Sequence, residues 1–164
     1  MSPRAAWRLE QLGFTDVYDY VPGKIDWFAN GLPREGKAAG TPWAGDLARD
    51  DVPTCTADEH VGDVRARVLA AGEDHCVVVN EHRIVVGLLR GDAMSKDEMA
   101  AGEVMELGPS TIRPDASVEK LLQSRRHQGV KRWIVSTSHG VLLGLLPRTH
   151  AERALEQSRS QATV

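Results

Sequence analysis

The 164-residue sequence contains only two cysteines, no long apolar run and no excess of charge of one sign. Cys55 and Cys76 cannot form a disulfide framework, and their spacing does not match a zinc site. No apolar run approaches the roughly 20 residues that cross a bilayer, so we expect no membrane partner. A net charge of −3 lacks the cationic field needed to bind nucleic acid without sequence preference, which excludes that class.

The composition is that of a folded protein. Apolar residues make up 41% and charged residues 26% of the chain, which argues against disorder. The length suits one compact domain or two small halves. The opening residues MSPRAAWR lack the apolar core of a secretory signal, so we expect a cytoplasmic protein.

Aromatic residues are nearly absent after position 43. Seven of the eight lie in residues 1–43, and Trp133 is the exception. A stretch rich in glycine and proline follows Asn30 and ends near Gly45, which is typical of a linker. We therefore predict an N-terminal segment of residues 1–45, followed by two units at 46–106 and 107–164.

The two predicted units contain an internal repeat at a constant offset of 57 residues. The matched positions are Thr54 with Thr111, Asp58 with Asp115, Val61 with Val118, Gly72 with Gly129, and Gly87-Leu88-Leu89 with Gly144-Leu145-Leu146. Chance does not readily give so many matches in one register. The repeat is the strongest signal in the sequence.

Each repeat shows the same order of elements, β-α-β-β-α, which predicts an α+β fold. In the first repeat we expect strands at 53–56, 76–80 and 84–89, a helix at 59–71 and another from about 92. In the second we expect an extended segment at 110–113, a helix from 115 that stops at Gly129, strands at 133–136 and 141–146, and a helix from 147–150 onward.

Residues 104–118 and 140–146 resemble a CBS (cystathionine-β-synthase) motif, and the first repeat resembles it in Thr54, Asp58, Val61 and 84–89. The resemblance covers residues 46 to about 158. It implies two motifs related by a pseudo-two-fold axis and a homodimer formed through these modules. It also implies clefts that bind a regulatory adenosine-containing ligand (AMP, ADP, ATP or S-adenosylmethionine), with no cofactor required.

The family binds such ligands with a pattern of glycine, two apolar residues, Thr, two variable residues and Asp. The glycine admits the ligand to the backbone, and the next helix offers free N–H groups to phosphate. After Gly87, Arg90 stands in the Thr position and Asp92 comes one residue early. After Gly144, Pro147 takes the Thr position and His150 the Asp position.

The resemblance makes six residues candidates for ligand binding: Thr54, Arg90, Asp92, Thr111, Arg148 and Thr149. A neutral histidine cannot replace a carboxylate that accepts two hydroxyls, so the second cleft departs further from the family pattern. Lys131 and Arg132 could favour phosphates there. Asp92 and Thr149 are also standard helix N-cap residues, and capping alone would explain them.

The N-terminal segment shows a different pattern. We expect a helix at 5–12 closed by Gly13, a strand at 15–20 and a helix that starts at 25–28. With Gly13-Phe14, Val17-Tyr18, Gly23 and Asp26-Trp27, this order resembles the C-terminal third of a rhodanese domain, as an αβα remnant. We expect its aromatic residues to pack on the repeats or on a second chain.

A rhodanese needs a nucleophilic cysteine in a loop that would precede the first of these helices. The sequence begins too late to contain that loop, unless the natural chain starts further upstream. We expect Cys55 and Cys76 to be small buried residues of the first repeat. The remnant is therefore expected to be structural.

The sequence thus favours a non-enzymatic sensor that binds an adenosine-containing ligand. A ligand-free structural dimerisation module is the main alternative, and a sulfurtransferase-related accessory protein without the catalytic cysteine is a third. No catalytic residue or metal ligand is predicted. The six histidines never recur at the spacing of a metal-binding helix, and no Ser/His/Asp signature is present.

Overall fold

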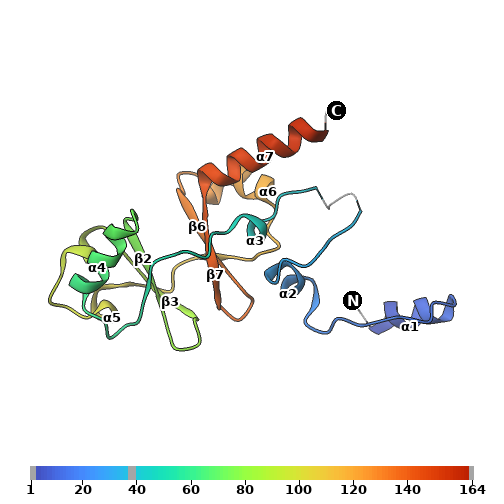
Figure 1. The fold of residues 1–164 in the computed structure, drawn as a ribbon, viewed down its shortest axis with the longest axis horizontal. Coiled ribbons are helices and arrows are strands. Elements are labelled where there is room, and N and C mark those ends of the chain that lie inside the picture. The colour runs from blue at the N-terminus through green and yellow to red at the C-terminus, as the bar shows by residue number, and fades with distance from the viewer. Residues whose placement is uncertain (1–2, 37–39, 163–164) are drawn as a thin grey trace.

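The computed structural model describes residues 3–36 and 40–162, which form two small sheets side by side and an N-terminal segment that extends away from them (Figure 1). The first sheet has the order β1-β2-β3-β4, and the second has the order β5-β6-β7. The strands are β1 (Thr54–Cys55), β2 (His75–Val79), β3 (Val85–Arg90), β4 (Glu106–Leu107), β5 (Thr111–Ile112), β6 (Arg132–Ser136) and β7 (Leu142–Pro147).

Helices cover one side of each sheet. The α-helices are α1 (Pro3–Gln11), α2 (Gly23–Ala29), α3 (Ala44–Leu47), α4 (Val61–Ala70), α5 (Ala101–Val104), α6 (Val118–Gln123) and α7 (Arg148–Ala162). Two short 3₁₀ helices are η1 (Gly91–Ser95) and η2 (Arg125–His127). In α4, Val61, Val64 and Val68 recur at helical spacing and are fully buried, as the amphipathic pattern of the sequence predicts.

Residues 57 apart occupy the same place in the two repeats. Thr54 pairs with Val77 in parallel, and Thr111 pairs with Ile134 in the same way. The antiparallel hairpins also share one register and one irregularity, after Val78 in the first repeat and after Val135 in the second. The α+β fold with two equivalent motifs is therefore confirmed.

The short helices α3 and α5 each precede the first strand of one repeat and pack on the other repeat. We call this arrangement the exchange of the short helices. Gly45 in α3 donates its N–H to Pro114 of the second repeat at 2.9 Å, and Gly102 in α5 donates to Ala57 of the first at 2.8 Å. These four residues again lie 57 apart in pairs. The chain between α3 and β1 also packs on the second repeat, because Arg49 forms a bridge with Leu145 of β7.

Some residues of each predicted unit contact the other unit. Residues 44–49 contact the second repeat, although the sequence assigns 46–49 to the first unit. Likewise β4 begins at Glu106, the last residue of the predicted first unit, and pairs with β3. The sequence did not predict α3 or α5, because four residues are too few for a periodic pattern.

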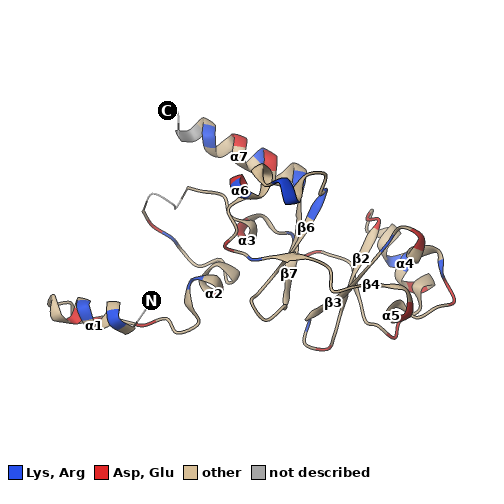
Figure 2. Cartoon of the chain, turned by 180° about the vertical axis from the view of Figure 1, so that it is seen from behind, with Lys and Arg blue, Asp and Glu red and all other residues tan. Residues whose placement is uncertain are grey.

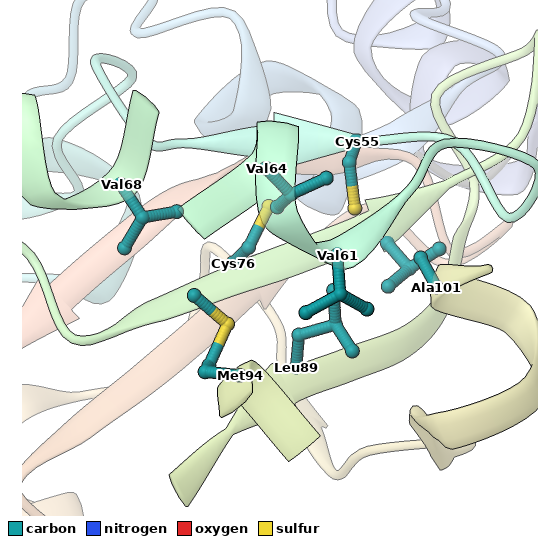
Figure 3. Close-up of a cluster of buried hydrophobic side chains, with 9 residues drawn as sticks. Cys55, Val61, Val64, Val68, Cys76, Leu89, Met94 and Ala101 are labelled. Atoms are coloured by element: carbon teal, nitrogen blue, oxygen red, sulfur yellow. The ribbon is translucent and has the colours of Figure 1, made fainter. Parts of the chain in front are cut away.

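The buried apolar side chains form three clusters, one inside each repeat and one between them. One lies inside the first repeat and includes Cys55 and Cys76, both buried as expected (Figure 3). A second lies inside the second repeat around Trp133. The third joins the two sheets, and its buried members are Val77, Val79, Ile134, Leu142 and Leu145. Burial of β-branched and aliphatic side chains in all three clusters stabilises one continuous body.

The N-terminal segment corrects one prediction. Residues 15–20 form no strand, because no neighbouring strand is present to pair with them, and a lone strand is not stable. The helices of the predicted αβα remnant are present as α1 and α2. Phe28 is buried and meets the Trp43 ring edge-on at 5.1 Å, whereas Trp7 and Tyr18 are 61% and 82% exposed. The expectation that the aromatics pack on the repeats holds only in part.

Candidate ligand-binding cleft

Equivalent residues of the two repeats meet each other along the pseudo-two-fold axis. At one end Ile84 forms a bridge with Val141, which lies 57 residues further on. At the other end the side chain of His75 contacts that of Arg132, again 57 residues apart. His75 begins β2 and Arg132 begins β6, so the central strands of both sheets start at this point.

A small cavity lies beside this second contact. Its lining comes from three segments: the chain before β1, the end of α4 with the start of β2, and the facing strands β6 and β7. The residues are Arg49, Asp51, Val52, Glu73, His75, Arg132, Leu145 and Pro147. The cavity volume is about 20 Å³, which is room for one water-sized group.

Ion pairs from both repeats narrow the cavity. The Arg49 guanidinium lies 2.8 Å from a carboxylate oxygen of Asp51 and 3.6 Å from one of Glu73. Arg132 donates to the carboxylate of Asp74 across the axis. That hydrogen bond, together with the nearby His75, lowers the pKa of Asp74 to about 2, so Asp74 is ionised at neutral pH. Both arginines are thus already paired with carboxylates.

His75 is the buried polar residue of this cluster, with only 3% of its surface exposed. Burial lowers its pKa, which keeps the imidazole neutral at neutral pH. Its Nδ1 lies 3.0 Å from a carboxylate oxygen of Asp74 and also contacts the guanidinium of Arg132. Its Nε2 is buried and has no hydrogen-bond partner among the described residues, although it belongs to a side chain that lines the cavity.

The same cluster brings potential metal ligands together without forming a metal site. Oxygen and nitrogen atoms of Glu73, Asp74 and His75 lie within 4.8 Å of one another. The guanidinium of Arg132, however, contacts both Asp74 and His75. A fixed positive charge at that distance repels a cation, so the arrangement does not favour a metal ion.

Two of the six predicted ligand residues lie at the end of the first repeat. Arg90 ends β3, and its Nε and Nη2 donate to Glu106 at 2.9 and 2.6 Å. By the offset of 57 residues, Glu106 is the equivalent of Arg49 and Arg90 is the equivalent of Pro147. Asp92 lies exposed in η1. Its carboxylate is therefore accessible to a ligand at this end of the repeat.

The remaining predicted residues lie on both repeats. Thr54 is half-buried in β1, and Thr111 in β5 accepts a hydrogen bond from Ser136 at 2.9 Å. Arg148 donates to the carbonyl oxygen of His127 at 3.0 Å and to Glu152 at 2.9 Å, and Thr149 is exposed. Arg148 therefore ties the start of α7 to the preceding loop. The structure does not bring these six residues together at the cavity beside His75.

Sequence reasoning missed most of the residues that line the cavity. Arg49, Asp74 and His75 carry no motif, and only Arg132 was considered as a phosphate contact. The repeat itself held the signal: the offset of 57 sets Glu73-Asp74-His75 against Val130-Lys131-Arg132. The first repeat has two acidic residues in this segment and the second has two basic ones, and Arg132 contacts both Asp74 and His75 across the axis. Figure 2 shows basic residues at the start of β6 and of α7.

A larger hollow lies away from the cavity beside His75. It is an open groove of about 540 Å³ between α2 and α6, lined by Lys24, Trp43, Asp115, Ala116, Ser117, Lys120, Leu121, Ser124 and His127. Lys24 lies 3.7 Å from Asp115 and 5.6 Å from the centre of the Trp43 ring. These contacts attach the N-terminal segment to the second repeat, and we assign the groove no further role.

Comparison with known proteins identifies the fold. The family model of the CBS domain matches residues 44–95, which include α3 and the first repeat up to the end of η1. A search of curated protein sequences found no match. No helix within residues 3–36 and 40–162 is long and apolar enough to cross a membrane.

Three solved structures illustrate the likeness. CBSX2 in complex with AMP has a TM-score of 0.63 and 19% identity, over 71% of this chain and 98% of that one. A CBS domain pair in complex with 5′-methylthioadenosine and S-adenosyl-L-methionine has a TM-score of 0.60 and 14% identity, over 71% and 98%. The CBS domains of a transcriptional regulator from Streptococcus pneumoniae have a TM-score of 0.61 and 20% identity, over 68% and 98%.

Residues 44–95 therefore match the model of the CBS domain, and the chain has the fold of a CBS domain pair. At these identities the likeness establishes the fold alone. The predicted resemblance of the N-terminal segment to a rhodanese remnant stays a prediction.

Proposed function

We propose that this protein is a non-enzymatic regulatory module that binds an adenosine-containing ligand, such as AMP, ADP, ATP or S-adenosylmethionine, between its two repeats. The observation that carries the proposal is the pair of repeats around one axis, with a cavity where they meet at His75 and Arg132. Pairs of the same fold have been solved with AMP and with S-adenosyl-L-methionine.

Regulation would follow from the way in which the repeats are joined. The third apolar cluster and the bridge between Ile84 and Val141 connect two sheets that otherwise carry their own cores. A cavity of about 20 Å³ is too small for an adenosine, so binding must widen the cleft. A ligand can shift the arrangement of the repeats only by its difference in affinity for the narrow and the wide form.

Calorimetry and thermal unfolding with AMP, ADP, ATP, S-adenosylmethionine and NAD test the proposal. A ligand at one hundred times its dissociation constant should stabilise the fold by about 2.7 kcal/mol. Light scattering with and without ligand tests the homodimer, which is part of the same proposal. If no ligand in the panel binds, the ligand-free structural module is the better description.

Asp92→Ala tests the predicted ribose contact. Asp92 is exposed, so its loss should weaken binding without unfolding the protein. Glu98→Ala is the matched control, because Glu98 is exposed in the turn that follows η1. Equal affinity of Asp92→Ala and the unchanged protein would remove Asp92 from the site.

A further inference from the structure

The two repeats carry opposite net charges, although the chain as a whole is nearly neutral. Residues 46–106 contain 14 acidic and six basic residues, a net charge of −8. Residues 107–164 contain four acidic and nine basic residues, a net charge of +5. We infer that two copies of this chain pair head to tail, with the first repeat of each copy on the second repeat of the other. The inference rests on the homodimer of the proposed function and names the surfaces that form it.

The helices present these charges at opposite ends of the molecule. The third apolar cluster joins the two sheets to each other, so the helices that cover each sheet lie on its outer side. Helices α4 and η1 cover the first repeat, and α6 and α7 cover the second. Figure 2 shows acidic residues around α4 and α5, and basic residues at the starts of β6 and α7.

Many of these charges have no counter-ion within the molecule. Asp63 in α4, Asp92 in η1 and Glu98 after η1 are exposed and form no ion pair with any residue that the structure describes. Six basic residues of the second repeat are exposed and equally unpaired within residues 3–36 and 40–162: Arg113, Lys120, Arg125, Arg126, Lys131 and Arg153. Each end therefore offers an excess of charge of one sign to a partner.

This asymmetry distinguishes the two ways in which the copies could pair. A head-to-head pair brings the two acidic repeats together and the two basic repeats together, so both contacts are repulsive. A head-to-tail pair brings opposite charges together twice, because a two-fold interface repeats each contact. Complementary charge thus selects the head-to-tail pair and suppresses the other.

The acidic end also offers apolar surface to the interface. Leu69, in the last turn of α4, is 65% exposed, and no other large apolar side chain of α3 to α7 is exposed among the described residues. Ala66 and Ala70 are exposed beside it, and Asp63 lies one turn earlier on the same side of the helix. Charge then sets the orientation, while this side of α4 supplies the apolar contact.

Cross-linking tests the orientation directly. Ala66→Cys in α4 and Gln123→Cys in α6 place an exposed thiol at equivalent positions of the two repeats. Head-to-tail pairing predicts that a short bis-maleimide joins two chains when the variants are mixed, and joins few chains when either variant is alone. The unchanged protein is the control, because its Cys55 and Cys76 are buried.

Charge reversal gives a second test with a definite sign. Asp63→Lys should make a head-to-tail dimer dissociate about threefold more readily in dilute salt, and sedimentation at high salt should show a smaller difference. In a head-to-head dimer the same change would relieve repulsion and tighten the pair. Glu81→Lys is the matched control, because Glu81 is exposed in the turn between β2 and β3, away from the helices.

Each outcome decides the inference. Efficient cross-links within either cysteine variant alone, tighter association of Asp63→Lys, equal effects of the two charge reversals, or a protein that stays monomeric would overturn it. Calorimetry with the nucleotide panel separates the inference from the proposed ligand. If the head-to-tail dimer forms and no ligand binds, the inference stands and the ligand role fails. If a ligand binds to a monomer or to a head-to-head dimer, the reverse holds.

Discussion

His75 and Arg132 stand at the same position of two successive repeats, and their side chains contact each other across the axis that relates them. Residues at equivalent positions can meet only on such an axis. A strict duplication would place two copies of one side chain there. This chain has instead a buried imidazole facing an arginine, with the acidic Glu73 and Asp74 beside the former and Lys131 beside the latter. The backbone is therefore symmetric about the axis, whereas the side chains on its two sides carry opposite charges.

The buried imidazole predicts a pH dependence of stability. Because burial lowers the pKa of His75 in the folded protein, the unfolded chain takes up the proton first as the pH falls. The free energy of unfolding should then decrease as the pH falls below about 6.5, the ordinary value for histidine. Below about 4 a second loss should follow, because the pKa of Asp74 is lowered to about 2.

Urea unfolding at a series of pH values measures both losses. His75→Gln should flatten the decline between pH 6.5 and the onset of the carboxylate titrations. The control is His82→Gln, since the side chain of His82 is exposed. An identical decline in His75→Gln and in the unchanged protein would contradict the assignment.

Two equivalent glycines should tolerate alanine differently. A Cβ on Gly144 would lie 2.2 Å from the carbonyl oxygen of Arg49, whereas one on Gly87 would lie 2.2 Å from the sulfur of Met105. A methionine side chain can move aside, but the backbone at Arg49 is held by two hydrogen bonds to Leu145, of 2.8 and 2.9 Å. Chemical unfolding should show a loss of about 2–4 kcal/mol for Gly144→Ala and a smaller loss for Gly87→Ala. Equal losses would contradict this explanation.

The two cysteines should be inert in the folded protein. Both thiols are buried, which keeps a reagent away from them. The hydrogen bond between them raises the pKa of Cys76, which burial raises further, and lowers that of Cys55, so burial alone protects Cys55. A chromogenic disulfide reagent should therefore modify neither thiol until the protein unfolds in denaturant. Rapid modification of the native protein would reopen a chemical role, and any thiosulfate:cyanide transfer lost in Cys55→Ser or Cys76→Ser would establish one.

The N-terminal arm, residues 3–21, should contribute little to stability. Helix α1 has no buried residue, and Figure 1 shows it away from both sheets. Removal of residues 1–21 should change the midpoint of thermal unfolding by no more than about 2 °C, which is the shift expected from a few tenths of a kcal/mol. Phe28→Ala is the contrast, because Phe28 is buried against Trp43 and its loss should cost about 2 kcal/mol or more. A large destabilisation by the truncation would contradict the exposed position of the arm.

The sequence predicted the parts of the fold that depend on repetition and periodicity. The helical spacing of apolar residues predicts α4, and the paired apolar runs at 76–80 with 84–89 and at 133–136 with 141–146 predict the two hairpins. The predicted strand at 15–20 was wrong. Alternating apolar and polar residues indicate which face of a strand would be buried, but they do not show whether a partner strand is present. The cavity was missed because its donors come from three segments that only tertiary packing unites.

The exchanged helices were within reach of the sequence. Ala44-Gly45 and Ala101-Gly102 also lie 57 residues apart, so the offset extends one helix further toward the N-terminus than the motif comparison used. Which repeat each helix covers could not be read from the offset. That choice depends on the length and direction of the chain that leads into β1 and β5.

The exchange of α3 and α5 also determines which half of the molecule a substitution destabilises. Ala101, near the end of the first unit, packs in the core of the first repeat. Its counterpart Ala44 packs in the core of the second repeat, around Val118 and Trp133, which lie more than seventy residues further along the chain. A lesion in the linker before β1 should therefore loosen the C-terminal half of the molecule first. A gene divided after residue 106 would leave the second half without α3, which closes its core, whereas the first half would keep α5.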